Sequence, residues 1–171
     1  EVRTVQPGSS SEALPLILVS FEKTCTSASW RFECDGHPGV ALRKTLQVGW
    51  RSNSAAVEYA IEAPEPVTLT LRPRVALRDF HHTLEKLDPG RFVTTRHGEQ
   101  GVSVEAEGHA VKIVCSTGTF TEDPDVSQHV DFATSRARED KEKFGEPLWS
   151  PGKFTVACDP GETHCVLALA L

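Results

Sequence analysis

Basic side chains gather in one stretch of the sequence, VTLTLRPRVALRDFHHT, over residues 67–83. Arginine, aspartate and histidine offer the hydrogen-bond donors and acceptors that can recognise the vicinal hydroxyl groups of a sugar. The residues that could do this are Arg72, Arg74, Arg78, Asp79 and His81. An aromatic ring beside them would supply an apolar platform for a sugar face, and the candidates are Trp30, Trp50, Phe80 and Trp149. The stretch predicts either a polyol-binding site or a wet strand face whose arginines lie over neighbouring side chains or pair with Glu58 and Glu62.

Other chemistries find little support in the sequence. The motifs of nucleophile elbows, phosphate loops and zinc peptidases are absent. His81 and His82 are adjacent, so on a strand they point to opposite faces, and no third ligand with suitable spacing accompanies them. Asp123 and Asp125 lie in TEDPD, residues 121–125, a segment typical of a solvated turn rather than of a calcium loop. We therefore expect no catalytic residue, no metal ion and no cofactor in this chain.

The composition indicates one globular domain. The chain has 171 residues, of which 39% are apolar and 25% charged, enough for a substantial core but too few for two large domains. Its net charge of -6 argues against nucleic-acid binding, which usually needs a basic surface. The apolar run Leu14–Val19 is too short to cross a membrane and lacks the flanks of a signal peptide. We therefore expect neither a nucleic-acid nor a membrane partner.

The cysteine pattern indicates a reducing compartment. The five cysteines are Cys25, Cys34, Cys115, Cys158 and Cys165. They are odd in number and form no CxxC pair, and three lie in apolar runs where a free cysteine behaves as a small hydrophobic residue. We expect reduced thiols and a cytoplasmic location, with a Cys25–Cys34 disulfide as an open alternative. Because the chain starts at Glu1 and contains no methionine, we expect it to be part of a longer or processed protein.

Strands must position these residues. In residues 67–78 the large apolar side chains occupy odd positions and threonine and arginine occupy even ones, as in a strand with one buried face. The odd positions are Val67, Leu69, Leu71, Val75 and Leu77, and the even ones are Thr68, Thr70, Arg72, Arg74 and Arg78. In residues 40–50 the same alternation places Val48 and Trp50 on the apolar face, and Asp35-Gly36 predicts a hairpin turn before it. Further strands are predicted over residues 16–21, 30–34, 55–61, 91–95, 102–106, 111–115, 154–158 and 165–169.

These strands predict the fold class. About ten short strands at steady spacing indicate an all-β protein, a two-sheet antiparallel β-sandwich. The polar, Gly/Ser/Pro-rich residues 1–13 predict a flexible lead-in, which leaves residues 14–171 as the sandwich domain.

One segment interrupts the strand pattern. Residues 130–145 are rich in helix formers, and Glu139 and Lys143 have the spacing of an i,i+4 pair, so we expect one short helix there. Gly145 would end this helix, and Ser150-Pro151-Gly152 would turn the chain into the next strand.

An ordered series of motifs resembles the amino-terminal domain of bacterial and archaeal type glycogen debranching enzymes. In the first half these motifs are WRFECDG at 30–36, VALRKTLQV at 40–48 and VEYAIEAPEPVTLTLRPRVALRDFHH at 57–82. In the second half they are TGTFTEDPDV at 117–126, DFATSRAREDKEKFGEPLWSPGKFTV at 131–156 and DPGE at 159–162. The resemblance covers about residues 21–171 and rests on the series rather than on any single motif.

The resemblance implies a supersandwich of the galactose-mutarotase-like type that precedes a helical-toroid catalytic domain. The resemblance also implies that the carboxylates for amylo-α-1,6-glucosidase chemistry lie in that toroid. The reaction needs a paired acid and base, and no convincing pair occurs in this sequence. The chain would then be a non-catalytic domain of a glycoside hydrolase. It would pack on the catalytic domain of the same chain and help to form the cleft for an α-glucan, either glycogen or maltodextrin.

The resemblance also implies site residues. The family's strand motif, close to L-R-P-x-x-A-x-R-D-[FY]-H, matches this sequence at Arg72, Arg78, Asp79, Phe80 and His81. These five become candidates for substrate binding or for the domain interface, with a local Arg78–Asp79 ion pair as an open alternative. The family's Gly-rich opening is absent. Two other functions therefore stay open: a stand-alone carbohydrate-binding or protein-interaction sandwich, and a mutarotase-type epimerase that would use His81 with a distant glutamate.

Overall fold

The computed structural model describes residues 2–4, 13–78, 84, 86–131 and 145–171. Within them the chain forms twelve strands and a single-turn 3-10 helix, Pro89–Arg91. The strands are β1 (Val2–Thr4), β2 (Leu16–Lys23), β3 (Ser27–Cys34), β4 (Ala41–Val48), β5 (Ser54–Ala63), β6 (Val67–Leu71), β7 (Val93–His97), β8 (Gly101–Ala106), β9 (His109–Cys115), β10 (Thr119–Asp131), β11 (Gly145–Cys158) and β12 (Gly161–Ala170).

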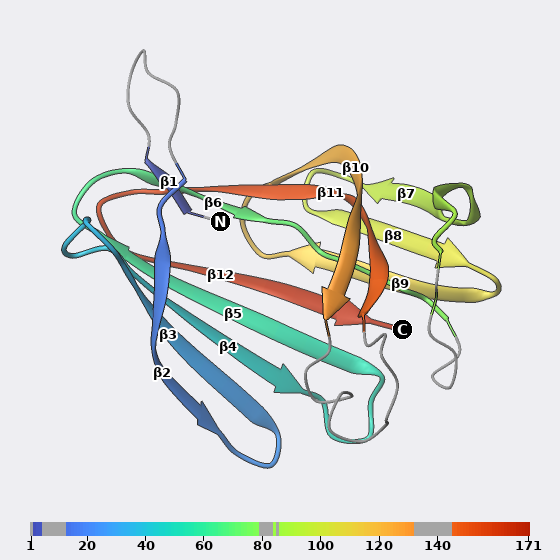
Figure 1. Ribbon diagram of the computed structural model, residues 1–171, viewed down its shortest axis with the longest axis horizontal. Helices are drawn as coiled ribbons and strands as arrows, with labels where there is room; N and C mark the ends of the chain where they lie inside the picture. Colours follow the sequence, from blue (N-terminus) through green and yellow to red (C-terminus); the bar gives the residue numbers. More distant parts are fainter. Residues whose placement is uncertain (1, 5–12, 79–83, 85, 132–144) are drawn as a thin grey trace.

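The strands form two antiparallel sheets. The larger sheet has eight strands in the order β2-β3-β4-β5-β12-β9-β8-β7, and the smaller has four in the order β1-β6-β11-β10. Figure 1 shows β6 and β11 running above the long, fanned strands β5 and β12 of the larger sheet. The predicted all-β antiparallel sandwich is therefore confirmed. No helix in the described ranges has the length and apolar content needed to span a bilayer.

The core lies between the sheets, where alternation along each strand directs apolar side chains inward. The larger sheet contributes Ile61, Val102 and Ile113, each at most 1% exposed, and the smaller sheet contributes Leu69 and Phe154. Each such side chain contributes about 1.5–3 kcal/mol on burial. The core therefore holds the two sheets together and fixes which strand faces point outward.

The larger sheet extends beyond the smaller one because eight strands face four. By register, Leu18 and Phe21 on β2 lie on the same face as the buried Leu42 on β4, yet each is about half exposed. Val48 at the end of β4 is 53% exposed and Trp50 in the following turn is 80% exposed. The predicted apolar face of residues 40–50 is thus buried at one end and open to solvent at the other.

Several local predictions were wrong, and each of them concerns a segment that contains proline. The strand starting at Val67 ends at Leu71 rather than Leu77, since Pro73 cannot donate to a ladder. The predicted solvated turn at residues 121–125 lies inside β10, and the predicted turn Ser150-Pro151-Gly152 lies buried inside β11.

The predicted hairpin turn at Asp35-Gly36 is present, with Gly36 at φ 74.

Two segments that were predicted to contain no strand, the lead-in and the helical segment, each contribute residues to a strand. In the predicted flexible lead-in, Val2–Thr4 forms β1 and pairs with Val67, Thr68 and Leu69 of β6. In the predicted helical segment 130–145, the ends belong to β10 and β11. The remainder of that segment, residues 132–144, and residues 5–12 of the lead-in lie outside the described part of the chain.

Candidate functional site

Arg78, one of the predicted site residues, forms a two-pronged ion pair with Glu146 on β11. Its Nε donates to Glu146 Oε2 at 2.6 Å and its Nη2 donates to Oε1 at 2.5 Å. The Glu146 side chain is 2% exposed and that of Arg78 is 18% exposed. The backbone N–H of Leu84 also donates to Glu146 Oε2, at 3.1 Å. The carboxylate therefore ties the segment after β6 to the start of β11.

Arg72, a second predicted site residue within the described ranges, lies just past the end of β6. Its Nη1 donates to the backbone carbonyl of Asp123 at 2.6 Å and its Nη2 to Asp123 Oδ2 at 2.5 Å. Lys153 Nζ lies 3.0 Å from the same carboxylate oxygen, and Arg74 Nη2 lies 3.3 Å from Asp125 Oδ2. We call this group, Arg72, Arg74, Lys153, Asp123 and Asp125, the arginine cluster.

A bulge in β10 brings Asp123 to Arg72. Glu122 pairs with Gly152 and Asp125 pairs with Ser150, so β10 carries one more residue than β11 in this interval, which is the signature of a β-bulge. Gly152 permits the close approach, since a Cβ there would lie 2.2 Å from the Thr121 carbonyl oxygen. The Lys153 ammonium and then the Arg72 guanidinium lower the pKa of Asp123. The carboxylate is thus held ionised between two cations.

The arginine cluster has the groups needed to contact hydroxyls. Its side chains are between 25% and 48% exposed, so donors and acceptors remain open to solvent while their partners hold them in place. The predicted pairing of these arginines with Glu58 and Glu62 was wrong, because Arg72 and Arg74 pair with Asp123 and Asp125. Asp79, Phe80 and His81, the remaining predicted site residues, lie outside the described residues.

The aromatic residues predicted to form an apolar platform have different surroundings in the structure. Trp149 is 5% exposed and stacks on Phe92 with ring centroids 4.5 Å apart and an interplanar angle of 1°, so it is a core residue. Trp30 lies between the Phe21 ring and the Lys44 ammonium, each 5.3 Å away. Trp50 remains an exposed ring, and Phe80 lies outside the described residues.

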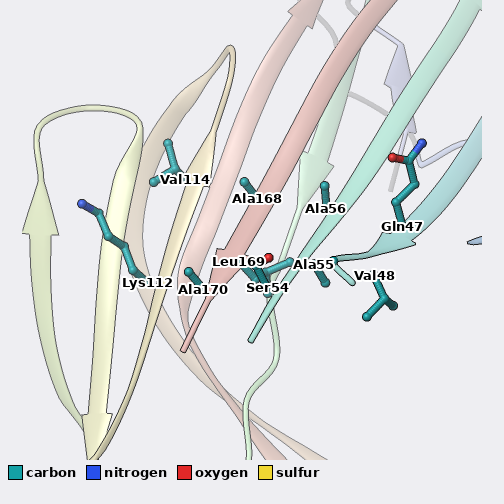
Figure 2. A pocket seen from close by; sticks show the side chains of 11 residues that line it. Gln47, Val48, Ser54, Ala55, Ala56, Lys112, Val114, Ala168, Leu169 and Ala170 are labelled. Atoms are coloured by element: carbon teal, nitrogen blue, oxygen red, sulfur yellow. The ribbon is translucent and has the colours of Figure 1, made fainter. Parts of the chain in front are cut away.

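A shallow groove on the outer face of the larger sheet was missed by the sequence reasoning. Ala168 lies opposite both Val114 on β9 and Ala56 on β5, and Ala56 lies opposite Gln47 on β4. Figure 2 shows the small Ala56 and Ala168 side chains between Val114 and Gln47. The groove has a volume of about 400 Å³, within the range of ligand pockets. Its remaining lining comes from Val48, Gly49, Ser54, Ala55, Lys112, Leu169 and Ala170.

The edge of this groove is apolar and open. Val114 is 37% exposed and Val48 is 53% exposed. Trp50 and Leu171 are not lining residues, but each directly follows one, Gly49 and Ala170 respectively, and both are more than 70% exposed. The Leu171 N–H donates to the Asn53 carbonyl at 2.9 Å. The alanines at alternate, outward positions of β5 and β12 were the available sequence signal, since a strand face of alanine leaves a depression between larger neighbours.

The remaining reactive groups are thiols. All five cysteines are free, with Cys25 exposed and the other four buried. Among the residues with described positions, no group of three or more His, Cys, Asp or Glu side chains is arranged to hold a metal ion.

Comparison with known protein families matches most of the chain. A family model described as "Glycogen debranching enzyme N terminal" matches residues 5–165 of the chain, which include every member of the arginine cluster and Arg78. None of the curated proteins searched matches the chain.

Proposed function

The chain belongs to the family of glycogen debranching enzyme N-terminal domains, and from this membership we propose that it is the non-catalytic sandwich domain of a debranching glycosidase. The observation that carries the proposal is the match over residues 5–165, nearly the whole chain. The carboxylates near the predicted site support a binding role, since Asp123, Asp125 and Glu146 are each committed to an arginine. A glycosidase acid–base pair would need carboxyl groups free to exchange protons with substrate and water.

We infer that the arginine cluster contacts the α-glucan, glycogen or maltodextrin. Arg72, Arg74 and Lys153 supply donors, and Asp123 and Asp125 supply acceptors, all at partly exposed positions. Such alternating donors and acceptors suit the hydroxyl pairs of a glucose ring. In the parent enzyme this cluster would form part of one wall of the glucan cleft, while amylo-α-1,6-glucosidase chemistry takes place in a following helical-toroid domain.

The second part of the proposal concerns the catalytic domain of the same chain. Its docking surface is the groove lined by Ala56 and Ala168, together with the exposed side chains of Val48, Trp50 and Leu171. Exposed apolar groups around a concave surface are typical of protein interfaces, and tryptophan is enriched among their strongest contacts. A cytoplasmic location is supported by the five free thiols.

Glucan binding is tested by affinity electrophoresis of the chain in gels that contain glycogen. Arg72→Met with Arg74→Met removes two donors of the arginine cluster and should weaken retardation about tenfold, the effect of losing roughly 1.4 kcal/mol of binding free energy. The matched control is Arg31→Met with Arg43→Met, which removes two arginines from exposed ion pairs on the other sheet. Equal retardation of the two double variants and the wild type would refute glucan contact by this cluster.

Docking is tested separately in the enzyme that carries this domain. Trp50→Ser with Ala168→Arg should loosen the domain and expose it to limited proteolysis, because one change removes an apolar contact and the other fills the groove with a charge. The control is Val93→Ser, at a 61% exposed position on β7. If both variants resist proteolysis like the wild type, the docking surface lies elsewhere, whatever the result with glycogen.

A further inference from the structure

Two buried thiols lie in direct contact inside the sandwich. Cys115 on β9 and Cys165 on β12 are 0% and 1% exposed, and their Sγ atoms are 3.2 Å apart. A disulfide bond has an S–S distance of about 2.05 Å, so the two residues are free thiols that need to approach by about one ångström to bond. Their positions in the fold decide whether that approach is possible.

The register of β9 and β12 fixes the pair. Cys115 lies opposite Leu167, and Cys165 is two residues from Leu167 and therefore on the same, inward face. Beyond this point Ser116 N–H donates to the Val166 carbonyl at 2.8 Å, and Val166 N–H donates to Ser116 Oγ at 2.9 Å. Strand pairing thus continues up to Cys115, and the Ser116–Val166 hydrogen bonds hold the strands at the position between the two thiols. Diagonal neighbours on such strands are within reach of each other's side chains.

The surroundings favour reaction between the two sulfur atoms. The hydrogen bond between the thiols raises the pKa of Cys115 and lowers the pKa of Cys165, which gives Cys165 the greater thiolate character. Cys115 Sγ also lies 2.6 Å from the Thr117 carbonyl oxygen. Ser116 and Thr117 form an exposed turn directly after β9, and local opening of such a turn gives small solutes access to the core.

We propose that Cys115 and Cys165 are a redox modification site that closes to a reversible disulfide when a hydroperoxide oxidises the pair. The Cys165 thiolate attacks a peroxide oxygen and breaks the O–O bond, which gives a sulfenic acid and, after protonation, water when the oxidant is hydrogen peroxide. The Cys115 sulfur then attacks the sulfenic sulfur, loses its proton and displaces a second water. The two thiols are oxidised by two electrons and hydrogen peroxide is reduced to two waters, so atoms and electrons balance.

The disulfide would enclose β10 and β11, because the two cysteines are 50 residues apart in sequence. Cross-links that close a loop of this size restrict the unfolded chain and usually raise the melting temperature. The oxidised domain should therefore melt at a higher temperature than the reduced domain, and a thiol reductant should reverse the change.

The test treats the folded chain with hydrogen peroxide, alkylates the remaining thiols under denaturing conditions and maps the peptides by mass spectrometry. Cleavage after Lys112, Arg136 and Glu162 places Cys115 and Cys165 on separate peptides and separates Cys165 from Cys158. We expect a reductant-sensitive link between the Cys115 and Cys165 peptides in the wild type and in Cys158→Ser. Cys115→Ser should lose both the link and the rise in melting temperature.

Three outcomes would overturn the proposal. They are full alkylation of both cysteines after peroxide treatment that oxidises the exposed Cys25, a link that runs through Cys158 instead, and a link that forms only when peroxide is added to the unfolded chain. If Cys115→Ser does not fold, the Cys158→Ser chain alone decides, since it retains both thiols of the pair and removes the neighbouring competitor.

Discussion

Breaking the ion pair between Arg78 and Glu146 should cost far more stability than breaking an exposed ion pair. Arg78→Met leaves the Glu146 carboxylate, which is 2% exposed, without its two guanidinium hydrogen bonds. Removal of one partner from a buried ion pair costs about 3–5 kcal/mol. Because Arg78 keeps 18% exposure and the Leu84 N–H still donates to the carboxylate, we expect a loss at the lower end, about 3 kcal/mol.

The assay is urea denaturation of four chains that form a double-mutant cycle: wild type, Arg78→Met, Glu146→Leu, and the double variant. The double variant buries no charge at this position, so its free energy of unfolding should lie closer to that of the wild type than the sum of the single losses predicts. The control is Arg31→Met, which breaks an ion pair whose side chains are 56% and 57% exposed and should cost less than about 1 kcal/mol.

A loss below about 1 kcal/mol for Arg78→Met, equal to that of the exposed control, would refute the claim that this ion pair holds the segment after β6 to β11. The same result would leave Arg78 as a surface group and would make a direct role in glucan contact the better interpretation of its match to the family motif.

Three further predictions follow from the same geometry. Gly152→Ala should lower the free energy of unfolding by about 1–3 kcal/mol, because its Cβ would lie 2.2 Å from the Thr121 carbonyl oxygen; an unchanged urea midpoint would contradict this. Asp123 has a lowered pKa, so its ion pairs stabilise the fold above the ordinary carboxyl pKa of about 4 and are lost as the pH falls through the lowered value; the gap in urea midpoint between wild type and Asp123→Asn should close in acid, and a constant gap would be inconsistent with this. Burial first, and then the charges of Cys165 and Cys115, raise the pKa of Tyr59 to about 12. The contribution of this pKa shift to the free energy of unfolding is therefore fully present below the ordinary tyrosine pKa of about 10, and it is lost as the pH rises from there through about 12. Tyr59 is the sole tyrosine in the sequence, so tyrosinate absorbance reports it directly, and a midpoint near 10 in the folded chain would be the contrary result.

The sequence predicted the fold class because burial on one face leaves a period-two record in each strand. β5, β8 and β9 show this record clearly, since their inward positions hold core residues such as Ile61, Val104 and Ile113. β10 was missed because Pro124 and three carboxylates occupy its first half. Local sequence does not show that a bulge accommodates them, or that basic partners lie just after β6 and on β11.

The candidate site was predicted less completely because its contacts join distant parts of the chain. Arg72 and Asp123 are 51 residues apart, and Arg78 and Glu146 are 68 apart. The sequence offered nearer partners, Glu58 and Glu62 for Arg72 and Asp79 for Arg78. Trp149 looked like a surface platform beside a Ser-Pro-Gly turn, but the strand continues through that turn and the ring stacks in the core on Phe92. Which apolar positions stay exposed also depends on how far the smaller sheet covers the larger one.

The most direct test of the proposed role is the mass of the native polypeptide in the source cells, measured by immunoblot with an antibody raised to this 18.7 kDa chain. If the chain is the N-terminal domain of a debranching glycosidase, the antibody should detect a band several times larger. A single band at the mass of the chain itself would contradict this, since no catalytic domain would then follow the sandwich.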